Sequence, residues 1–302
     1  MTPPPPEVDD LVTEAQDPAS ADLDLRSTLE LVELMNAEDA TVAASVGATA
    51  DAVAAAIDAV AERIVRGGRL VYVGAGTSGR LAALDAAECE ATFSSKPGQV
   101  AALVAGAELS SADARDAAED NSESGRADLE TFGVSSADAV IGVSASGRTP
   151  YVEGALAAAR DAGALTVALV SSTGSTLAEL ADHEIAVVVG PEVLAGSTRL
   201  KAGTAQKLVL NMISTITMIR LGKTYGNLMV DVRPSNEKLR ERQRRVVEIA
   251  TGADRTEIEE ALAEAGGNAK VAIVSLLAEI DAASALARLE EAGGNVRLAL
   301  RR

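Results

Sequence analysis

Glycine and hydroxyl side chains follow an apolar segment at residues 70–73, which is predicted to form a buried β-strand. The loop contains Gly74, Ala75, Gly76, Thr77, Ser78 and Gly79, and a helical pattern starts within it. Glycine lets the backbone approach a ligand closely, free N–H groups at a helix start point outward, and the helix dipole favours negative charge. We therefore expect this loop to bind an anion, and we expect that anion to be a phosphate group.

A second loop of the same type follows a later apolar segment at residues 139–143. It contains Ser144, Ser146, Gly147 and Thr149, and a helix is predicted to start near Pro150. Since ligands of open α/β sheets bind beyond the carboxyl ends of the strands, the two loops could face one anion. Helix capping is the plainer interpretation of such hydroxyls. Capping explains one hydroxyl per loop, but not three in SASGRT and two in GTS.

The G-x-G-x-x-G spacing at residues 74–79 also fits a dinucleotide-binding loop. Such a site needs an acidic residue about 20 positions further on, at the end of the second strand, to hold the ribose. Here the second predicted strand is residues 100–104, and the first acid after it, Glu108, lies 29 residues beyond Gly79. The hydroxyls of this loop also stand where a pyrophosphate site prefers bare backbone. We therefore rank a monophosphate well above a dinucleotide.

Carboxylates are the candidates for acid–base chemistry. The chain has a single histidine, His183, and a single cysteine, Cys89, which removes the usual general base and most zinc sites from consideration. Cys89 has no histidine nearby in the sequence to activate it, so we expect it to be a packed residue. Glu88 lies in an otherwise uncharged stretch of the helix that leaves the first loop. Glu119 has other acidic residues around it, and either glutamate could instead be solvated surface.

The composition excludes several classes of function. The net charge of the 302-residue chain is −18, whereas nucleic-acid binding depends on Lys and Arg side chains that neutralise phosphates. A single cysteine excludes an intrachain disulfide and fits a reducing compartment. No apolar run reaches the ~20 residues that a membrane helix requires, and no secretory signal is visible. We therefore expect a cytoplasmic protein that binds neither nucleic acid nor a membrane.

Apolar runs of four to six residues alternate with helical segments. Strands are predicted at residues 70–73, 100–104, 139–143, 165–170 and 185–189. This alternation is typical of parallel strands joined by crossover helices, so we expect a doubly wound α/β sheet of about five strands. One long helix is expected over residues 41–66, and a polar helical stretch over residues 113–125.

The C-terminal third has a different character. A helix at residues 205–221 is apolar on most faces, so it is predicted to be either a core helix or a subunit interface. Beyond Gly252 the pattern predicts short helices, and the sequence AGGN recurs around Gly267 and Gly294. Each Gly-Gly-Asn is expected to stop one helix and to start another, which gives a small helical appendage.

Together these stretches resemble one family closely, the N-acetylmuramic acid 6-phosphate etherases of the sugar isomerase (SIS) superfamily. The motifs that carry the resemblance are GAGTSGRLAALDAAEC, AAEDNSESG, GVSASGRTPYV and GPEVLAGSTRLKAGTAQKLVLNMIST, and it covers nearly all of the chain beyond the tail. One departure is Glu90-Ala91, where the family usually has two prolines. The resemblance implies a three-layer αβα SIS domain over residues 25–250, with a flexible tail at 1–24 and a small helical domain at 251–302.

The resemblance also implies a reaction. Cleavage of the D-lactyl ether of N-acetylmuramic acid 6-phosphate would give N-acetylglucosamine 6-phosphate and D-lactate, with Glu88 and Glu119 as the catalytic residues. The residues expected to bind the substrate and its phosphate are Gly76, Thr77, Ser78, Ser144, Ser146, Gly147, Thr149, Glu192, Ser197, Thr198 and Lys201. For Lys201, an ion pair with an acidic side chain is the alternative. The resemblance implies a homodimer and requires no metal and no cofactor.

Two other functions share this fold. Glucokinase regulatory proteins resemble the etherases, so a regulatory protein that senses sugar phosphates without catalysis is one alternative. An aldose–ketose isomerase of the same superfamily is another, and a ketose product would identify it. The presence of both glutamates and the length of a single SIS domain favour the etherase.

Overall fold

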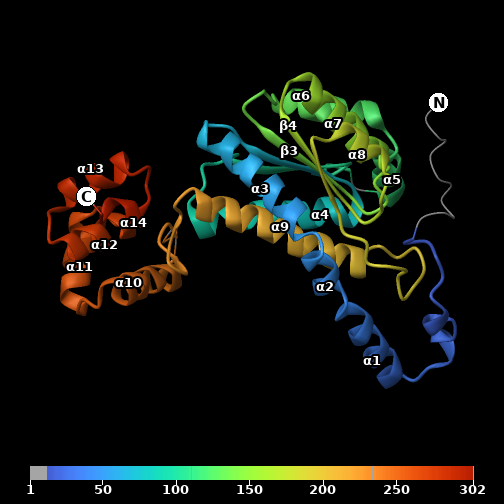
Figure 1. The fold of residues 1–302 in the computed structure, drawn as a ribbon, viewed down its shortest axis with the longest axis horizontal. Coiled ribbons are helices and arrows are strands. Elements are labelled where there is room, and N and C mark those ends of the chain that lie inside the picture. The colour runs from blue at the N-terminus through green and yellow to red at the C-terminus, as the bar shows by residue number, and fades with distance from the viewer. Residues whose placement is uncertain (1–11, 110, 233, 235, 302) are drawn as a thin grey trace. The chain divides into compact units, whose positions relative to one another are not determined.

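The computed structural model describes residues 12–109, 111–232, 234 and 236–301 (Figure 1). Its main sheet has five strands, which are β1 (Leu70–Gly74), β2 (Val100–Val104), β3 (Ala139–Ser144), β4 (Leu165–Val170) and β5 (His183–Ala186). The strand order is β2-β1-β3-β4-β5, and all neighbours are parallel. The predicted parallel sheet of about five strands is therefore confirmed.

The strands form where the sequence is continuously apolar. Every residue of β1, β3 and β4 is buried, as expected for parallel strands with helices on both faces. The last strand is shifted from the prediction of 185–189, because β5 begins at His183 and pairs with residues 167–170 of β4. Since β4 ends at Val170, the residues after Val187 have no strand beside them and leave the sheet.

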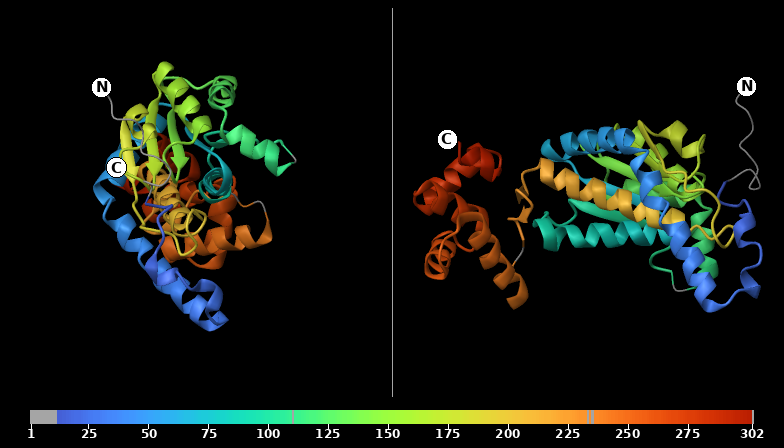
Figure 2. Two further views of the ribbon diagram at one scale, coloured as in Figure 1. Left: turned by 90° about the vertical axis from the view of Figure 1, so that its right-hand side faces the viewer. Right: turned by 60° about the horizontal axis from the view of Figure 1, so that its bottom comes forward.

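Helices cover both faces of this sheet. On one face α3 packs against β3, β4 and β5, and on the other α7 packs against β1, β3 and β4. Figure 1 shows α6, α7 and α8 on one side of the sheet and α3, α4 and α9 on the other, and Figure 2 shows α4 and α9 running side by side. The bounds are α1 (Thr28–Asp39), α2 (Val42–Gly47), α3 (Ala50–Val65), α4 (Gly76–Phe93), α5 (Ala112–Glu119), α6 (Ser122–Phe132), α7 (Pro150–Asp161), α8 (Thr176–Leu180) and α9 (Lys201–Arg220).

Two helices that were predicted to be continuous are broken. The segment 41–66 divides into α2 and α3, because Gly47 is a weak helix former and the Thr49 hydroxyl bonds the Val46 carbonyl oxygen at 2.8 Å. The polar segment 113–125 divides into α5 and α6. Asn121 caps α6 there by accepting the Ser124 N–H at 3.0 Å.

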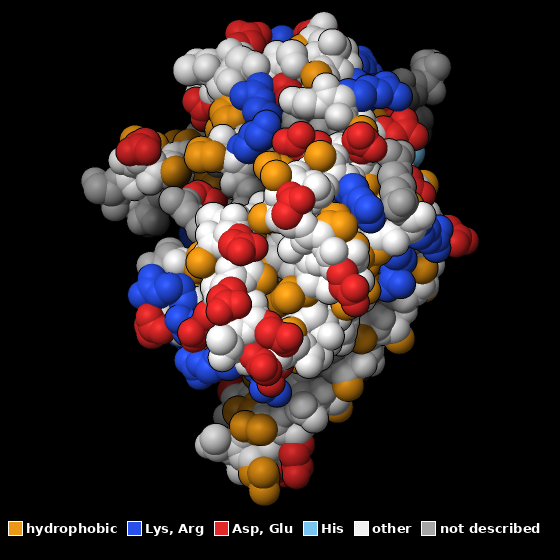
Figure 3. Space-filling view, turned by 90° about the vertical axis from the view of Figure 1, so that its left-hand side faces the viewer, with side chains coloured by type: hydrophobic (Ala, Val, Ile, Leu, Met, Phe, Trp, Pro, Cys, Tyr) orange, Lys and Arg blue, Asp and Glu red, His pale blue; other side chains and the backbone are white. Residues whose placement is uncertain are grey.

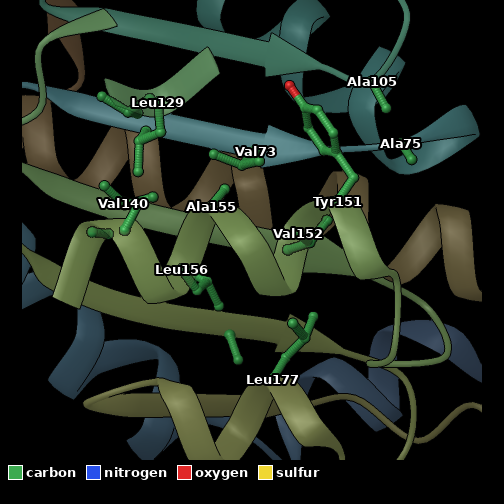
Figure 4. Close-up of a cluster of buried hydrophobic side chains, with 14 of the residues drawn as sticks. Val73, Ala75, Ala105, Leu129, Val140, Tyr151, Val152, Ala155, Leu156 and Leu177 are labelled. Carbon is green, nitrogen blue, oxygen red and sulfur yellow. The ribbon is translucent and has the colours of Figure 1, made fainter. Parts of the chain in front are cut away.

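The core between α7 and the sheet is built from aliphatic side chains. Figure 4 shows Val152, Ala155 and Leu156 of α7 directed toward the strands, with Leu129 of α6 beside them. Helices α6 and α7 approach very closely. A Cβ added to Gly125 would lie 1.8 Å from the Tyr151 carbonyl oxygen, so this crossing requires glycine.

The chain divides into two compact units. One contains the sheet and comprises residues up to Ala86 and residues 98–214, and the other comprises residues 87–97 and 215–302. The second contains α10 (Glu237–Thr251), α11 (Arg255–Glu264), α12 (Ala269–Ala278), α13 (Ala282–Glu291) and α14 (Val296–Ala299), with the short antiparallel strands β6 (Thr224–Tyr225) and β7 (Leu228–Met229). The domain boundary drawn at residue 251 stays a prediction.

The repeated Gly-Gly-Asn segments act as predicted in the second unit. Asn268 accepts the Val271 N–H at 3.2 Å and caps α12, and Asn295 accepts the Leu298 N–H at 3.1 Å and caps α14.

On the face in Figure 3, the coloured acidic and basic side chains are interspersed, and they form no extended basic patch there.

The N-terminal segment is described only in part. Of the tail expected at residues 1–24, residues 1–11 lie outside the described residues. After them come two 3₁₀ turns, Pro18–Ser20 and Leu23–Leu25, and the carbonyl of the buried Thr13 accepts the Gly196 N–H at 3.1 Å. Among the described residues, no one helix has the length and apolarity to cross a membrane. Two bent pairs meet these criteria only when the two members are taken together. The first pair is the segment 28–47, which contains α1 and α2, with α3, and the second is α11 with α12.

Candidate active site

The two glycine- and hydroxyl-containing loops lie at one end of the sheet. Strand order reverses at β1, because the chain continues from β1 to β2 on one side while β3 pairs with the other. Gly74 at the end of β1 is paired with Val143 of β3, so the loops that leave these strands are neighbours. Ligands of open α/β sheets bind in the crevice at such a reversal. The structure therefore brings the two predicted anion-binding loops together.

The loop after β1 is shaped by close backbone contact. A Cβ on Gly79 would lie 2.6 Å from the Gly74 carbonyl oxygen and 2.7 Å from a Val104 methyl, so only glycine lets the first turn of α4 press against the strand ends. Thr77 and Ser78 occupy this turn and are partly exposed. The 18-residue helix α4 directs its N-terminal dipole toward the same place. This is the geometry that a phosphate group requires.

The loop after β3 is held by its own hydroxyl groups. The buried Ser144 Oγ lies 2.9 Å from Thr149 Oγ1 and accepts the Gly147 N–H at 3.0 Å. Ser146 Oγ accepts the Arg148 N–H at 3.3 Å. Gly147 has φ +72°, and a Cβ there would meet the Ser175 Cβ at 2.3 Å. The hydroxyls of Ser144 and Thr149 thus fix the loop, whereas Ser146 is partly exposed beside it.

The segment before α9 reaches the first loop. A Cβ on Gly203 would lie 3.6 Å from the Thr77 methyl and 3.4 Å from the Thr198 carbonyl oxygen, so Gly203 lies next to both residues. Ser197 and Thr198 are both partly exposed here.

Glu192 and Lys201 have structural partners in this segment. The fully buried Glu192 carboxylate accepts the N–H groups of Lys201 and Ala202, at 2.9 and 3.0 Å, and so caps α9. Lys201 is 3% exposed, and its ammonium group pairs with Glu38 of α1 at 2.7 Å. This is the ion pair that the sequence left as an alternative, and substrate contact by either residue stays a prediction.

Glu119 ends α5 and lines a cavity of about 470 Å³. The described lining residues are Gly76, Arg80, Ala83, Val104, Ala105, Ala107, Asp116 and Glu119. Burial raises the pKa of the Glu119 carboxyl, the Asp120 and Asp116 carboxylates raise it further, and the Arg80 guanidinium opposes them. A carboxyl with a raised pKa in a cavity beside a predicted anion-binding loop is a candidate for proton transfer.

Glu88 is placed differently. It is exposed on α4, twelve residues beyond Gly76, which corresponds to roughly 18 Å of helix rise. Glu88 is not among the described residues that line the Glu119 cavity. Cys89 beside it is buried, as the sequence suggested for a packed residue. Within the part of the chain that the structure describes, no three His, Cys, Asp or Glu side chains are grouped to hold a metal ion.

The sequence reasoning missed two residues near the site. Arg80 projects into the Glu119 cavity, and Asp85 is buried one turn before Glu88 on α4. The Asp85 carboxylate accepts hydrogen bonds from Tyr72, Asn211 and Ser214. The signal for Asp85 was an acid at a core-facing position of a helix, and the signal for Arg80 was a cation in the first turns after an anion-binding loop.

Comparison with known proteins places the chain in a family. A model described as the glucokinase regulatory protein N-terminal SIS domain matches residues 52–160, and a model of the SIS domain matches residues 127–216. Among solved structures, a phosphoheptose isomerase from Francisella tularensis covers 64% of this chain and is itself covered completely, with a TM-score of 0.52 and 17% identity. That similarity concerns the fold alone.

Relatives with much higher identity are similar over nearly the whole chain. A protein of Rubrobacter xylanophilus is 59% identical over 96% of each chain, and one of Streptomyces avermitilis is 57% identical over 97% of this chain and 94% of its own. One of Edwardsiella ictaluri is 50% identical over 97% and 98%. Each is named N-acetylmuramic acid 6-phosphate etherase. The chain described here belongs to the N-acetylmuramic acid 6-phosphate etherase family.

Proposed function

We propose that this protein is a lyase that cleaves the lactyl ether of N-acetylmuramic acid 6-phosphate and releases D-lactate and N-acetylglucosamine 6-phosphate. The observation that carries the proposal is identity of up to 59% to proteins of that name over nearly the full length. The site supports it, because a proton-transfer carboxyl, Glu119, lies in a cavity next to a phosphate-binding geometry.

The chemistry needs proton transfer and an anchored phosphate. In the open aldehyde form of the substrate, the proton on C2 is acidic because it is next to a carbonyl group. Its removal, with loss of lactate from C3, gives an unsaturated aldehyde, and addition of water to that double bond completes the reaction. We assign the proton transfers to Glu88 and Glu119, with Glu88 as the group that protonates the departing lactate.

Phosphate anchoring is assigned to the loops at the strand reversal. The partly exposed Thr77 and Ser78 in the first turn of α4, together with the partly exposed Ser146, are the proposed hydroxyl donors. Ser144, Gly147 and Thr149 hold the second loop in the conformation that presents it. Ser197 and Thr198 are assigned to the same crevice because they precede α9, whose Gly203 lies next to Thr77.

D-lactate release from N-acetylmuramic acid 6-phosphate, without added metal or nucleotide, tests the function. Glu88→Gln is expected to lower turnover by ~10²–10⁴ while inorganic phosphate still binds. Glu264→Gln, at an exposed position of α11, is the matched control and should retain wild-type turnover. No lactate from folded wild-type protein would instead favour the regulatory protein that senses sugar phosphates.

We also propose a homodimer in the cytoplasm. Apolar side chains are exposed on one stripe of α1, where Leu29 is 65% and Val32 59% exposed, and Leu84 of α4 is 57% exposed. A second copy that covers these faces would account for them. The exposed part of α4 that carries Glu88 would then lie against the second copy. We assign Glu88 to the Glu119 cavity of that copy.

Light scattering and subunit mixing test the assembly. A monodisperse monomer at micromolar concentration would refute the dimer. If Glu88 serves the other copy, mixing inactive Glu88→Gln and Glu119→Gln subunits restores part of the turnover, because mixed dimers contain one intact site. Mixed dimers without activity would show that both glutamates must come from the same chain.

A further inference from the structure

The Glu119 cavity contains one basic group among its described lining residues, the Arg80 guanidinium. Arg80 lies on the first turns of α4 and is exposed. Within the part of the chain that the structure describes, it has no ion-pair partner, although Asp116 and Glu119 line the same cavity. A cation that is left unpaired in a chain of net charge −18 is available to an anionic ligand.

The position of this cavity relative to the phosphate-binding loops limits which part of a ligand can enter it. Gly76 belongs both to the first loop and to the cavity wall, and the remaining wall comes from α4, α5 and the segment after β2. The loop after β3 is on the opposite side of β1 from β2. A ligand anchored by its phosphate at the strand reversal therefore extends its other end toward Arg80 and Glu119.

The substrate of the proposed function has a second anion at that end. Its lactyl group ends in a carboxylate, which two acidic side chains in the cavity would repel unless a cation compensates. Arginine pairs with carboxylates through two parallel hydrogen bonds, and it keeps its charge throughout the accessible pH range. The small side chains of Ala83, Ala105 and Ala107 leave room beside it for the methyl group of the lactyl moiety.

We propose that Arg80 binds the carboxylate of the lactyl group and thereby makes the enzyme specific for acidic 3-ethers of the sugar phosphate. This inference rests on the proposed function, because it assigns one end of that substrate to this cavity. Binding by Arg80 would hold the leaving group beside Glu119, so that Arg80 also orients the C3–O bond that breaks.

The test compares two substrates that differ in one charge. Formation of N-acetylglucosamine 6-phosphate is measured from N-acetylmuramic acid 6-phosphate and from its lactamide, in which a neutral amide replaces the carboxylate. In wild type, kcat/KM for the acid is expected to exceed that for the amide. Arg80→Gln is expected to lower the ratio of the two by about 10²-fold, and Arg80→Lys by less because one point charge remains.

The ratio separates this role from a purely electrostatic one. Arg80 also lowers the pKa of Glu119, so its removal shifts the pH profile, but that shift affects both substrates alike and cancels in the ratio. Arg66→Gln, at an exposed position after α3, is the control and should leave the ratio unchanged. An unchanged ratio in Arg80→Gln would overturn the assignment. Wild type that converts neither substrate would instead refute the proposed function.

Discussion

Asp85 of α4 connects this helix to β1 and to α9. Its carboxylate is 6% exposed and accepts hydrogen bonds from Tyr72 Oη of β1 at 2.9 Å, and from Asn211 Nδ2 and Ser214 Oγ of α9 at 2.6 and 3.0 Å. Replacing Asp85 with Ala removes the carboxylate acceptor from all three donors. Replacing it with Asn keeps one carbonyl oxygen for the two donors on α9, and Tyr72 can rotate its hydroxyl to accept from the new amide.

The expected loss follows from the number of donors. A buried hydrogen bond contributes about 1 kcal/mol net, so Asp85→Ala should cost about 3 kcal/mol of unfolding free energy. For a domain of this size, 1 kcal/mol corresponds to roughly 2–4 °C, which predicts a fall in Tm of about 6–12 °C. Asp85→Asn should lose no more than about 1 kcal/mol.

The charge of Asp85 adds a dependence on pH. Burial raises the pKa of this carboxyl, although its hydrogen bonds oppose the shift. Because the folded state then binds the proton more tightly than the unfolded state, stability falls as pH rises from the ordinary aspartate pKa through the raised one. Asp85→Asn removes that fall, so its Tm should vary less with pH across this window.

Thermal unfolding followed by circular dichroism measures both effects. Asp51→Ala, at an exposed position in the first turn of α3, is the control and should change Tm by only a few degrees. The reasoning would be refuted if Asp85→Ala melted within 2 °C of wild type. It would also be refuted if Asp85→Asn were destabilised as much as Asp85→Ala, since the acceptor would then not be what matters.

Two further predictions concern packing and acid stability. Gly125→Ala should destabilise the protein by roughly 1–3 kcal/mol in urea unfolding, because the added Cβ would overlap the Tyr151 carbonyl. Gly47→Ala is the control, since a Cβ there has no neighbouring atom within 4 Å, and it should be neutral or slightly stabilising. Burial alone would raise the pKa of Asp138, but hydrogen bonds from Arg69 and Ser135 hold this pKa below its usual value. The contribution of Asp138 to stability is therefore present above the ordinary aspartate pKa, and it is lost as pH falls through the folded-state value. Asp138→Asn should therefore lower Tm near neutral pH more than in strong acid, and an equal loss at both pH values would contradict this.

The sheet could be predicted because its strands are almost purely apolar. Residues 100–104 and 165–170 are strands with the predicted bounds, since a buried parallel strand needs apolar side chains on both faces. The predictions failed where local sequence was ambiguous. The break between α5 and α6 depends on the Asn121 cap, and the end of the last strand depends on where its neighbour β4 ends.

The candidate site was predictable to a different extent. The two loops could be recognised from their glycines and hydroxyls, because the groups proposed to bind an anion belong to residue types that are visible in the sequence. The signals for Arg80 and Asp85 were weaker, because they depend on knowing which face of α4 is covered. The partners of Lys201 and Glu192 were likewise hidden, since Glu38 lies 163 positions from Lys201 in the sequence and meets it only after folding.

The electrostatics of the site explain how an acidic protein can hold an anionic substrate. At the proposed phosphate site, backbone N–H groups and hydroxyls supply positive potential without adding charged side chains. The cavity beside it contains two carboxyls and one guanidinium, and burial raises the pKa of Glu119 there. A carboxylate with a raised pKa takes up a proton more readily, so the negative surroundings that oppose an anionic substrate also favour proton uptake by Glu119.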